Sequence, residues 1–333
     1  MTNRMPSAVA GVLLVSAHAA CNSASEEAEA PACDRACLIA LTNDYVAGLE
    51  GKSTEGIPFS DEVKIVENLK PIRAGEGLWT DVTGAGGDFS VVVPDEANQT
   101  AGWLGMVERD GKPAVVAVRL KLDPRGSIVE AEHLYAEISA EPQFANLQTV
   151  RPGLLAEVPE ANRLSHDELI RIGASYYDAL DDNDGSLTPF AEDCQRHENG
   201  MVTAGPGPRV GPGPNNNTAP IARDCAGQLT SGVFQYIDRI DNRRVFAADP
   251  VTGLVMGLSH FRHPMDFEPY EVTALDGSKI MYDKSRLPFE PFDLPAAHIY
   301  KVGADGKVHE IEAMGFRADL NSPSGWDNTI AAK

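Results

Sequence analysis

The chain has 333 residues, with 28 lysines and arginines against 49 aspartates and glutamates, so its formal net charge is −21. Its 43% of hydrophobic and 23% of charged residues are typical of a globular protein and exclude a disordered or collagen-like chain. A strongly acidic chain without a local basic patch repels phosphate backbones and anionic lipids, which argues against nucleic acid or a membrane surface as a partner.

An export signal is predicted over residues 1–20. Arg4 precedes an apolar run at 8–17 that is too short to span a bilayer as a permanent helix. The following Ala17-His18-Ala19 has small residues at the two positions that a signal peptidase reads. We therefore expect an exported protein.

An acidic tether, residues 21–32, follows the signal and begins with Cys21. A bacterial lipoprotein begins in the same way, with a lipidated cysteine after small residues. Because His18 stands where such lipoproteins usually carry leucine, the sequence leaves open whether Cys21 is lipidated. The protein is accordingly expected in the periplasm or as a lipoprotein of the outer membrane, with a lipid anchor as its one contact with the membrane.

Four further cysteines support export to an oxidising compartment. Cys33 and Cys37 are one helical turn apart, and Cys194 and Cys225 flank a stretch rich in glycine, proline and asparagine, so each pair is expected to form a local disulfide. The two other pairings of these cysteines stay open. A metal site is the rival interpretation, but the sequence has no Cys-x-x-Cys and no histidine at a zinc-like spacing, so we predict no metal.

The sequence contains an internal repeat. Residues 38–68 align without a gap on residues 169–199 at an offset of 131, and a later register has an offset of 180, so the second copy has gained 49 residues in between. Two copies of one domain follow, and we assign the first to 33–150, a linker to 151–162 and the second to 163–328. The matched residues of the first register include Leu38/Leu169, Tyr45/Tyr176, Leu49/Leu180, Pro58/Pro189, Phe59/Phe190, Glu67/Glu198 and Asn68/Asn199.

Each copy is predicted to begin with a helix and to continue with strands. Apolar residues recur at three- and four-residue steps over 38–49 and 169–180, and Ser165 and Glu168 form a capping box before the second helix. Strand-like alternation then dominates, and turn dipeptides such as Asp110-Gly111 indicate hairpins. We therefore expect a leading helix packed on a curved antiparallel sheet in each copy, and the fold class is α+β.

Five blocks of the second copy carry a resemblance: YYDAL, PFAEDCQRHENG, CAGQLTSGVFQYI, RRVFAADPVTGLVMGLSHFRHP and IYKVGADGKVHEIEAMGF. They resemble exported tandem proteins with nuclear-transport-factor-2-like (SnoaL-like) domains, over residues 33–328 and most sharply at 193–200. The resemblance implies two cones, in each of which a long helix packs into a strongly bent sheet and leaves an apolar pocket at the wide end. Such cones host dehydratases, isomerases, polyketide cyclases and lyases of aromatic molecules, usually without a cofactor, whereas others only bind.

The densest candidate cluster is Arg196-His197-Glu198-Asn199. In a strand, Arg196 and Glu198 share one face and His197 and Asn199 share the other, so only one pair can face the interior of the cone. Burial there shifts the pKa of acid–base groups, which suits His197 and Glu198 as catalytic residues and Arg196 and Asn199 as substrate-binding residues. The alternative is a structural ion pair between Arg196 and Glu198 beside a histidine that faces solvent.

The first copy keeps only half of this cluster. Glu67-Asn68 aligns with Glu198-Asn199, whereas Ile65-Val66 stands at the positions of Arg196-His197. We infer that the shared Glu-Asn pair serves the scaffold and that the added arginine and histidine are the functional novelty of the second copy.

A second candidate group lies on a later strand. Leu258, His260 and Arg262 share one face of it, and Phe261 and His263 share the other. If the aliphatic face lines the pocket, His260 is the general base and Arg262 an oxyanion partner. The family resemblance instead favours Phe261 and His263, which fit its F-x-H-P pattern, although Arg262 departs from the acidic residue expected between them. Both interpretations stay open.

The second helix offers two phenols, those of Tyr176 and Tyr177, as donors to a substrate oxygen. Tyr45 occupies the matching position of the first helix, so core packing is the alternative role for Tyr176. In the first copy, His133, Trp79 and Trp103 are the comparable candidates, with filling of the cone as the alternative role of the aromatic residues.

Motifs of other enzyme classes are absent from the sequence, which has no G-x-S-x-G, H-E-x-x-H or phosphate loop. We expect an exported lyase that needs no cofactor and acts on a small aromatic, for example lignin-derived, molecule by His-centred acid–base catalysis, through dehydration, decarboxylation or formaldehyde release. An isomerase or cyclase of polycyclic substrates and a periplasmic protein that only binds an apolar small molecule are the alternatives. A structural role with the two copies packed sheet to sheet is a third, and a homo-oligomer is left open.

Overall fold

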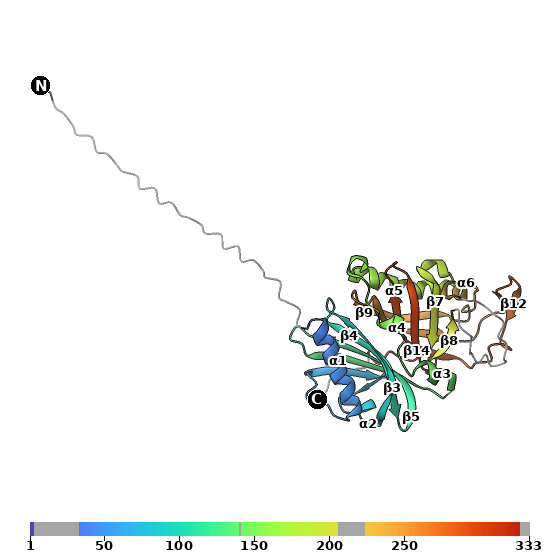
Figure 1. The fold of residues 1–333 in the computed structure, drawn as a ribbon, viewed down its shortest axis with the longest axis horizontal. Coiled ribbons are helices and arrows are strands. Elements are labelled where there is room, and N and C mark those ends of the chain that lie inside the picture. Colours follow the sequence, from blue (N-terminus) through green and yellow to red (C-terminus); the bar gives the residue numbers. More distant parts are fainter. Residues whose placement is uncertain (3–32, 140, 206–223, 327–333) are drawn as a thin grey trace. The chain divides into compact units, whose positions relative to one another are not determined.

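A computed structural model describes residues 1–2, 33–139, 141–205 and 224–326 (Figure 1). The predicted signal peptide, the tether and Cys21 lie outside the described residues, as does most of the stretch rich in glycine, proline and asparagine. Within these ranges, no helix combines the length and the apolar character that crossing a bilayer requires.

The first copy consists of helix α1 (Arg35–Glu50) and a six-stranded sheet. Its strands are β1 (Phe59–Glu67), β2 (Lys70–Ile72), β3 (Val82–Asp95), β4 (Thr100–Arg109), β5 (Lys112–Leu122) and β6 (Ile128–Glu137). They lie in the order β2-β1-β6-β5-β4-β3. The predicted sheet is antiparallel, but β1 pairs with β6 in parallel because the β1–β2 hairpin adds to the edge of the β3–β6 meander.

The second copy repeats this topology. Helix α5 (His166–Asp181) precedes strands β7 (Phe190–Glu198), β8 (Met201–Ala204), β9 (Arg239–Asp249), β10 (Leu254–His263), β13 (Phe292–Val302) and β14 (Val308–Gly315). These strands lie in the order β8-β7-β14-β13-β10-β9, with the parallel pair again between the first and last strands. Each strand therefore has one counterpart in the first copy, and two tandem α+β domains of one fold are confirmed.

Each helix lies in the concave face of its own sheet, as the apolar stripes predict. Tyr45 and Leu49 of α1, and Tyr176 and Leu180 of α5, are all at most 1% exposed. The predicted capping box before α5 is present. A helix seated in a bent six-stranded sheet is the cone that the family resemblance implies, and we call the two domains the first and second cone.

The two cones pack against each other through the outer faces of their sheets. One apolar cluster draws on both: Leu104, Met106 and Val115 of the first cone meet Leu254 and Met256 of the second. Ion pairs flank this core, from Arg244 to Glu132 at 2.6 Å and from Arg35 to Asp249 at 2.9 Å. Strands at the centre of each sheet are therefore buried on both faces.

The residues gained by the second copy are divided between two insertions. The segment 205–238, which contains helix α6 (Cys225–Thr230), replaces the short link with helix α2 (Leu78–Asp81) in the first copy. The segment 264–291 carries a hairpin of β11 (Tyr270–Thr273) and β12 (Lys279–Tyr282), where the first copy has a two-residue turn. In Figure 1, α6 and β12 lie at the same end of the second cone.

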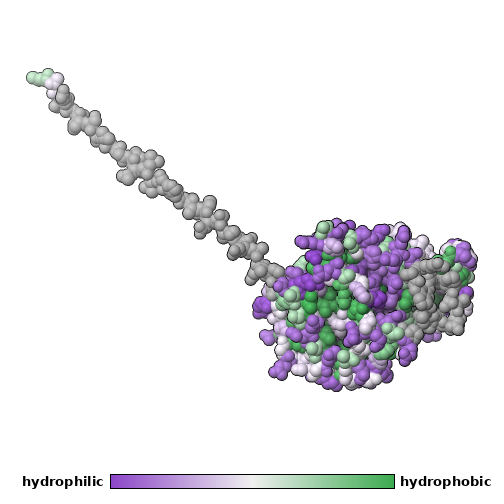
Figure 2. Space-filling view, in the orientation of Figure 1, coloured by the Kyte–Doolittle hydropathy of each residue, from purple (hydrophilic) through white to green (hydrophobic). Residues whose placement is uncertain are grey.

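The remaining elements are short and link the cones or end the second helix. They are α3 (Glu141–Asn146), α4 (Pro152–Leu155), η1 (Glu160–Asn162) and η2 (Gly185–Leu187). Both expected disulfides are formed, between Cys33 and Cys37 and between Cys194 and Cys225. Two disulfides fit an exported protein. Hydrophilic residues cover much of the face shown in Figure 2.

Candidate functional site

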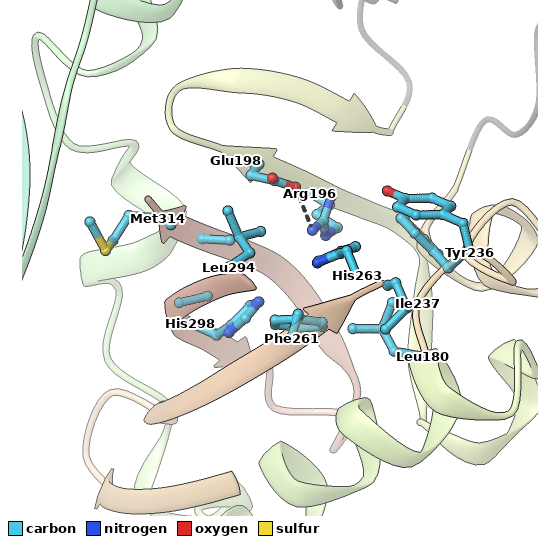
Figure 3. Close-up of a pocket in the computed structure, with 14 residues that line it drawn as sticks. Leu180, Arg196, Glu198, Tyr236, Ile237, Phe261, His263, Leu294, His298 and Met314 are labelled. Carbon is cyan, nitrogen blue, oxygen red and sulfur yellow. Dashed lines mark hydrogen bonds and ion pairs between the residues drawn. The ribbon is translucent and has the colours of Figure 1, made fainter. Parts of the chain in front are cut away.

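A cavity of about 40 Å³ lies inside the second cone (Figure 3). Its walls come from the concave face of the sheet, the last turn of α5 and the inserted segment 234–237. Apolar walls are supplied by residues such as Phe261 and Leu294, and polar groups by Arg196, Glu198, Tyr236, His263 and His298. A cavity of this size holds about three water molecules.

The cavity exists because the last strand of the second cone carries small side chains. Ala313 and Gly315 line it and stand where β6 of the first cone has His133 and Tyr135. A methyl group on Gly315 would approach the Leu294 side chain to 3.1 Å, so even alanine there would crowd the cavity wall. Two small residues on one strand thus create the space inside the second cone.

Arg196 is the buried cation of the site, at 6% exposure. Its guanidinium donates to the Tyr176 hydroxyl at 2.7 Å, to Thr203 Oγ1 at 2.7 Å and to Glu198 Oε2 at 2.8 Å. Burial alone would lower the pKa of Arg196, but Tyr176 and Glu198 outweigh it and raise the pKa above its usual value. Three of the five guanidinium protons are used, so donors remain for a ligand oxygen.

His263 lies between aromatic rings at the edge of the cavity. Its imidazole stacks on Phe292 at 4.3 Å between centroids and 5° between planes, and the Tyr236 ring lies 5.5 Å away. Burial lowers the pKa of His263 to about 4, so the imidazole is neutral at pH 7. No hydrogen-bond partner of Nδ1 occurs among the described residues. A neutral imidazole with a free nitrogen can accept a proton.

His298 points into the same cavity from β13 (Figure 3). It is 1% exposed, its ring is parallel to that of Tyr300, and its Nδ1 lies 3.4 Å from the Tyr177 hydroxyl. Burial and the nearby Arg196 lower the pKa of His298 to about 3, and burial raises the pKa of Tyr177 to about 12. Both groups are therefore neutral at pH 7, and the phenol holds the imidazole in place.

The sequence reasoning missed His298 and Tyr236. His298 follows the apolar run 294–297 of its strand, and the available signal was that the first copy has Val118 at the aligned position. Tyr236 lies on an insertion without a counterpart in the repeat. Burial and the Glu198 carboxylate raise the pKa of Tyr236, so its phenol stays protonated.

His197, expected as a catalytic residue, does not face the cavity. The alternation of 196–199 holds, and Arg196 and Glu198 are the inward pair. His197 instead contacts the linker, where Arg151 Nη1 donates to its Nδ1 at 3.1 Å and Arg151 also pairs with Glu312 at 2.6 Å. Burial, Arg151 and Arg196 lower the pKa of His197 to about 3. Its place between sheet and linker gives it a structural role.

The face of β10 that carries His260 and Arg262 is also turned away from the cavity. Arg262 Nη1 contacts His260 Nε2 at 3.2 Å and donates to Asp293, and its Nε donates to Asp241 at 2.9 Å. His260 and Arg262, expected as base and oxyanion partner, therefore do not line this cavity. Phe261 and His263, which the resemblance favoured, are the inward residues.

Asn199 was expected to bind substrate, but its amide is occupied by the neighbouring strand. It donates to the Gly315 carbonyl at 2.9 Å and accepts from the Gly315 amide at 3.0 Å. Asn68 makes the same two bonds to Tyr135 in the first cone. The asparagine of the repeated Glu-Asn pair thus makes the same contacts in both cones, and Tyr176 accepts a hydrogen bond from Arg196.

Large side chains occupy the corresponding part of the first cone. Both ring nitrogens of His133 are hydrogen-bonded: Nε2 lies 2.8 Å from the Tyr45 hydroxyl, and Nδ1 lies 3.0 Å from Glu67 Oε2. Glu67 also accepts from the Leu78 amide at 3.0 Å, and Trp79 packs on His133 at 5.3 Å between centroids. The network is closed and fully buried, which suits a core rather than a binding site.

No group of three or more metal-ligating side chains that could hold an ion occurs in the part of the chain that the structure describes. The polar groups of the cavity are a guanidinium, a carboxylate, two neutral imidazoles and a phenol. This set can bind an oxyanion and move a proton, and both functions need only the chain itself.

Residues 162–315 match a protein family described as a domain of unknown function, DUF8021. No curated protein matches the chain. Among solved structures, the chain is similar to that of SalBIII, an epoxide hydrolase/cyclase-like enzyme described for its role in pyran ring formation in polyether salinomycin. That similarity has a TM-score of 0.26 and 13% identity, over 45% of this chain and 92% of that chain, and is too weak to carry an argument.

Proposed function

We propose that the second cone performs acid–base catalysis on a small aromatic molecule without a cofactor. The observation that carries the proposal is a cavity in which two neutral imidazoles, His263 and His298, lie with the buried guanidinium of Arg196. Neutral imidazole is the form that accepts a proton, and a buried cation stabilises the negative charge that proton removal creates. The first cone, filled by its own side chains, supports the second.

His263 is the proposed base, because it has a free nitrogen and a ring plane fixed by Phe292. It removes a proton from a carbon next to a conjugated carbonyl, whose oxygen takes up the electron pair as an enolate beside Arg196, or it removes the proton of a phenol, whose oxygen keeps the pair as a phenolate. Tyr236, whose raised pKa keeps its proton, is placed to protonate a leaving hydroxyl. Dehydration and formaldehyde release both begin with such a step, and Arg196 also suits the anion formed in decarboxylation.

The cavity restricts what can react. At about 40 Å³ it is much smaller than typical ligand pockets of about 300–1,000 Å³, so an aromatic substrate must displace side chains at the rim. The movable wall is the inserted segment with Phe234 and Tyr236, which the β11–β12 hairpin contacts through the Tyr270 hydroxyl and the Val233 carbonyl at 3.2 Å. Both insertions of the second cone therefore meet at this wall.

The test is incubation of the protein in D₂O with a set of aromatic alcohols, ketones and carboxylic acids, followed by mass spectrometry. Proton abstraction introduces deuterium, and lysis shortens the molecule. His263→Gln and Arg196→Ile should each lower the rate at least about 100-fold, as expected for loss of a general base or an oxyanion partner.

His197→Gln and His260→Gln are the matched controls, since both histidines are buried beside arginines but lie outside the cavity. They should leave the rate within a factor of about 3. Equal losses in all four variants would contradict the assignment of the site.

Simple retention of an apolar molecule is the second candidate function, and the many apolar residues of the cavity wall favour it. It predicts recovery of an unchanged molecule without deuterium. An isomerase or cyclase would instead give a rearranged product of the same elemental composition, heavier only by the deuterium that it takes up from the solvent.

A further inference from the structure

A groove of about 710 Å³ runs beside the cavity, between the β1–β2 hairpin of the first cone and the chain that follows β14. Its charged lining consists of Glu67, Lys70, Arg317 and Asp319. The formal charges of these four residues cancel, so the groove is a neutral region on a chain with a net charge of −21. An anionic molecule meets less repulsion here than the whole chain would impose.

Phe292 and His263 connect the walls of this groove and of the cavity. Phe292 lines the groove, and its ring stacks at 4.3 Å on His263, which lines the cavity. Two chain segments run from one space to the other. Leu294 lines the cavity and Phe292, two residues earlier, lines the groove; Gly315 lines the cavity and Arg317, two residues later, lines the groove. The two spaces are thus adjacent.

Arg317 is a cation without an anion. Its guanidinium carbon lies 4.2 Å from the Phe292 centroid and 5.4 Å from that of Phe289, while no carboxylate of the described residues lies within 4.0 Å of its nitrogens. Glu67, by contrast, is held by His133 and the Leu78 amide. A guanidinium that contacts an aromatic ring does not use its N–H groups on a carboxylate, and these groups fit a carboxylate in a bidentate manner.

We propose that Arg317 and Phe292 form a second recognition site, which binds the carboxylate end of an aromatic carboxylate substrate. This inference rests on the proposed function, since it places the reacting end of that substrate at His263. The aromatic ring packs beside Phe292 in the groove, its carboxylate pairs with Arg317, and a reacting substituent extends past Phe292 into the cavity. If only the reacting substituent enters the cavity and the ring stays in the groove, the small volume of the cavity no longer excludes an aromatic substrate.

The test uses two probes of the same shape, 2-naphthoate and its neutral amide, 2-naphthamide, with binding to the full chain followed by calorimetry. The wild-type protein should bind the carboxylate more tightly than the amide. Arg317→Leu should weaken binding of the carboxylate about tenfold and leave the amide unchanged, as expected for loss of a charge-assisted pair. Arg317→Lys should recover only part of the loss.

Arg171→Leu is the matched control, because Arg171 is an exposed arginine on α5 away from the groove. It should change neither affinity. The proposal is overturned if the wild-type protein does not prefer the carboxylate, or if Arg317→Leu and Arg171→Leu behave alike. His263→Gln separates this proposal from the catalytic one, since it should abolish the reaction and leave naphthoate binding unchanged. If the D₂O experiment detects no reaction but naphthoate still binds through Arg317, the groove proposal is supported and only the proposed chemistry is contradicted.

Discussion

The two cones have one backbone plan and opposite interiors. In the first, His133 and Tyr135 project from the last strand, and Trp79 fills the remaining space. In the second, Ala313 and Gly315 take the places of the first two, and a cavity remains. The comparison shows that the size of the side chains on the last strand, β6 or β14, decides whether the interior of a cone is filled or contains a cavity.

The polar groups of the two cones also differ: those of the first cone are bonded to one another, whereas those of the second line the cavity. Glu67 of the first cone is enclosed by His133 and the Leu78 amide, whereas Glu198 of the second pairs with Arg196, which replaces Ile65. In the first cone His133 uses both of its ring nitrogens within this network. The second cone gained an arginine and lost the side chains that would cover it.

The largest expected difference between the two interiors is the loss of unfolding free energy on truncating a buried aromatic residue, here Trp79 in the first cone. Trp79→Ala removes a fully buried indole from the filled cone and should lower the free energy of unfolding by about 3–5 kcal/mol. Phe234→Ala, at the half-buried wall of the cavity, should cost less than about 2 kcal/mol because that ring borders space already. Urea unfolding measures both, and equal costs would contradict the difference in packing.

Acid should destabilise the second cone through its neutral histidines. His298 has a native pKa of about 3 and an unfolded pKa of about 6.5, so between these values the unfolded chain binds the extra proton and stability falls as the pH falls. From pH 7 to pH 5 this one group should cost about 2 kcal/mol of unfolding free energy.

His298→Phe should remove this share of the pH dependence in urea titrations. His309 is the control with the opposite sign, because Asp305 and Asp193 outweigh partial burial and raise its pKa. Its contribution is present below the unfolded pKa and is lost as the pH rises through the folded pKa. A steeper loss of stability in acid after His298→Phe would refute the burial argument.

Filling the cavity from Gly315 should have the smallest effect on stability and a clear effect on binding. Gly315→Ala brings a methyl group to 3.1 Å from Leu294 and should cost about 1 kcal/mol. Gly84→Ala is the control, since its methyl group would meet nothing closer than 3.9 Å. Calorimetry with a 2-naphthoate that carries a hydroxymethyl substituent on its second ring, as the group that enters the cavity, should show weaker binding only for the Gly315 variant; unchanged binding would mean that the cavity is not used.

Part of the site could be predicted from the sequence because strand alternation is local. The separation of Arg196 and Glu198 from His197 and Asn199 follows from the period of two, and the structure has the same division. The choice between the two faces of β10 could not be made in this way. Every residue of that strand is buried, since one face meets α5 and the other meets the first cone.

The sequence by itself determined the duplication, the leading helices and the fold class, because these depend on periodicity, and it favoured the two disulfide pairs that formed without excluding the other pairings. The tertiary structure alone decided which histidines share the cavity. His263 and His298 lie on adjacent strands, and the inserted Tyr236 reaches them from a third segment. Their proximity depends on strand register and on the packing of the two sheets, which no local pattern specifies.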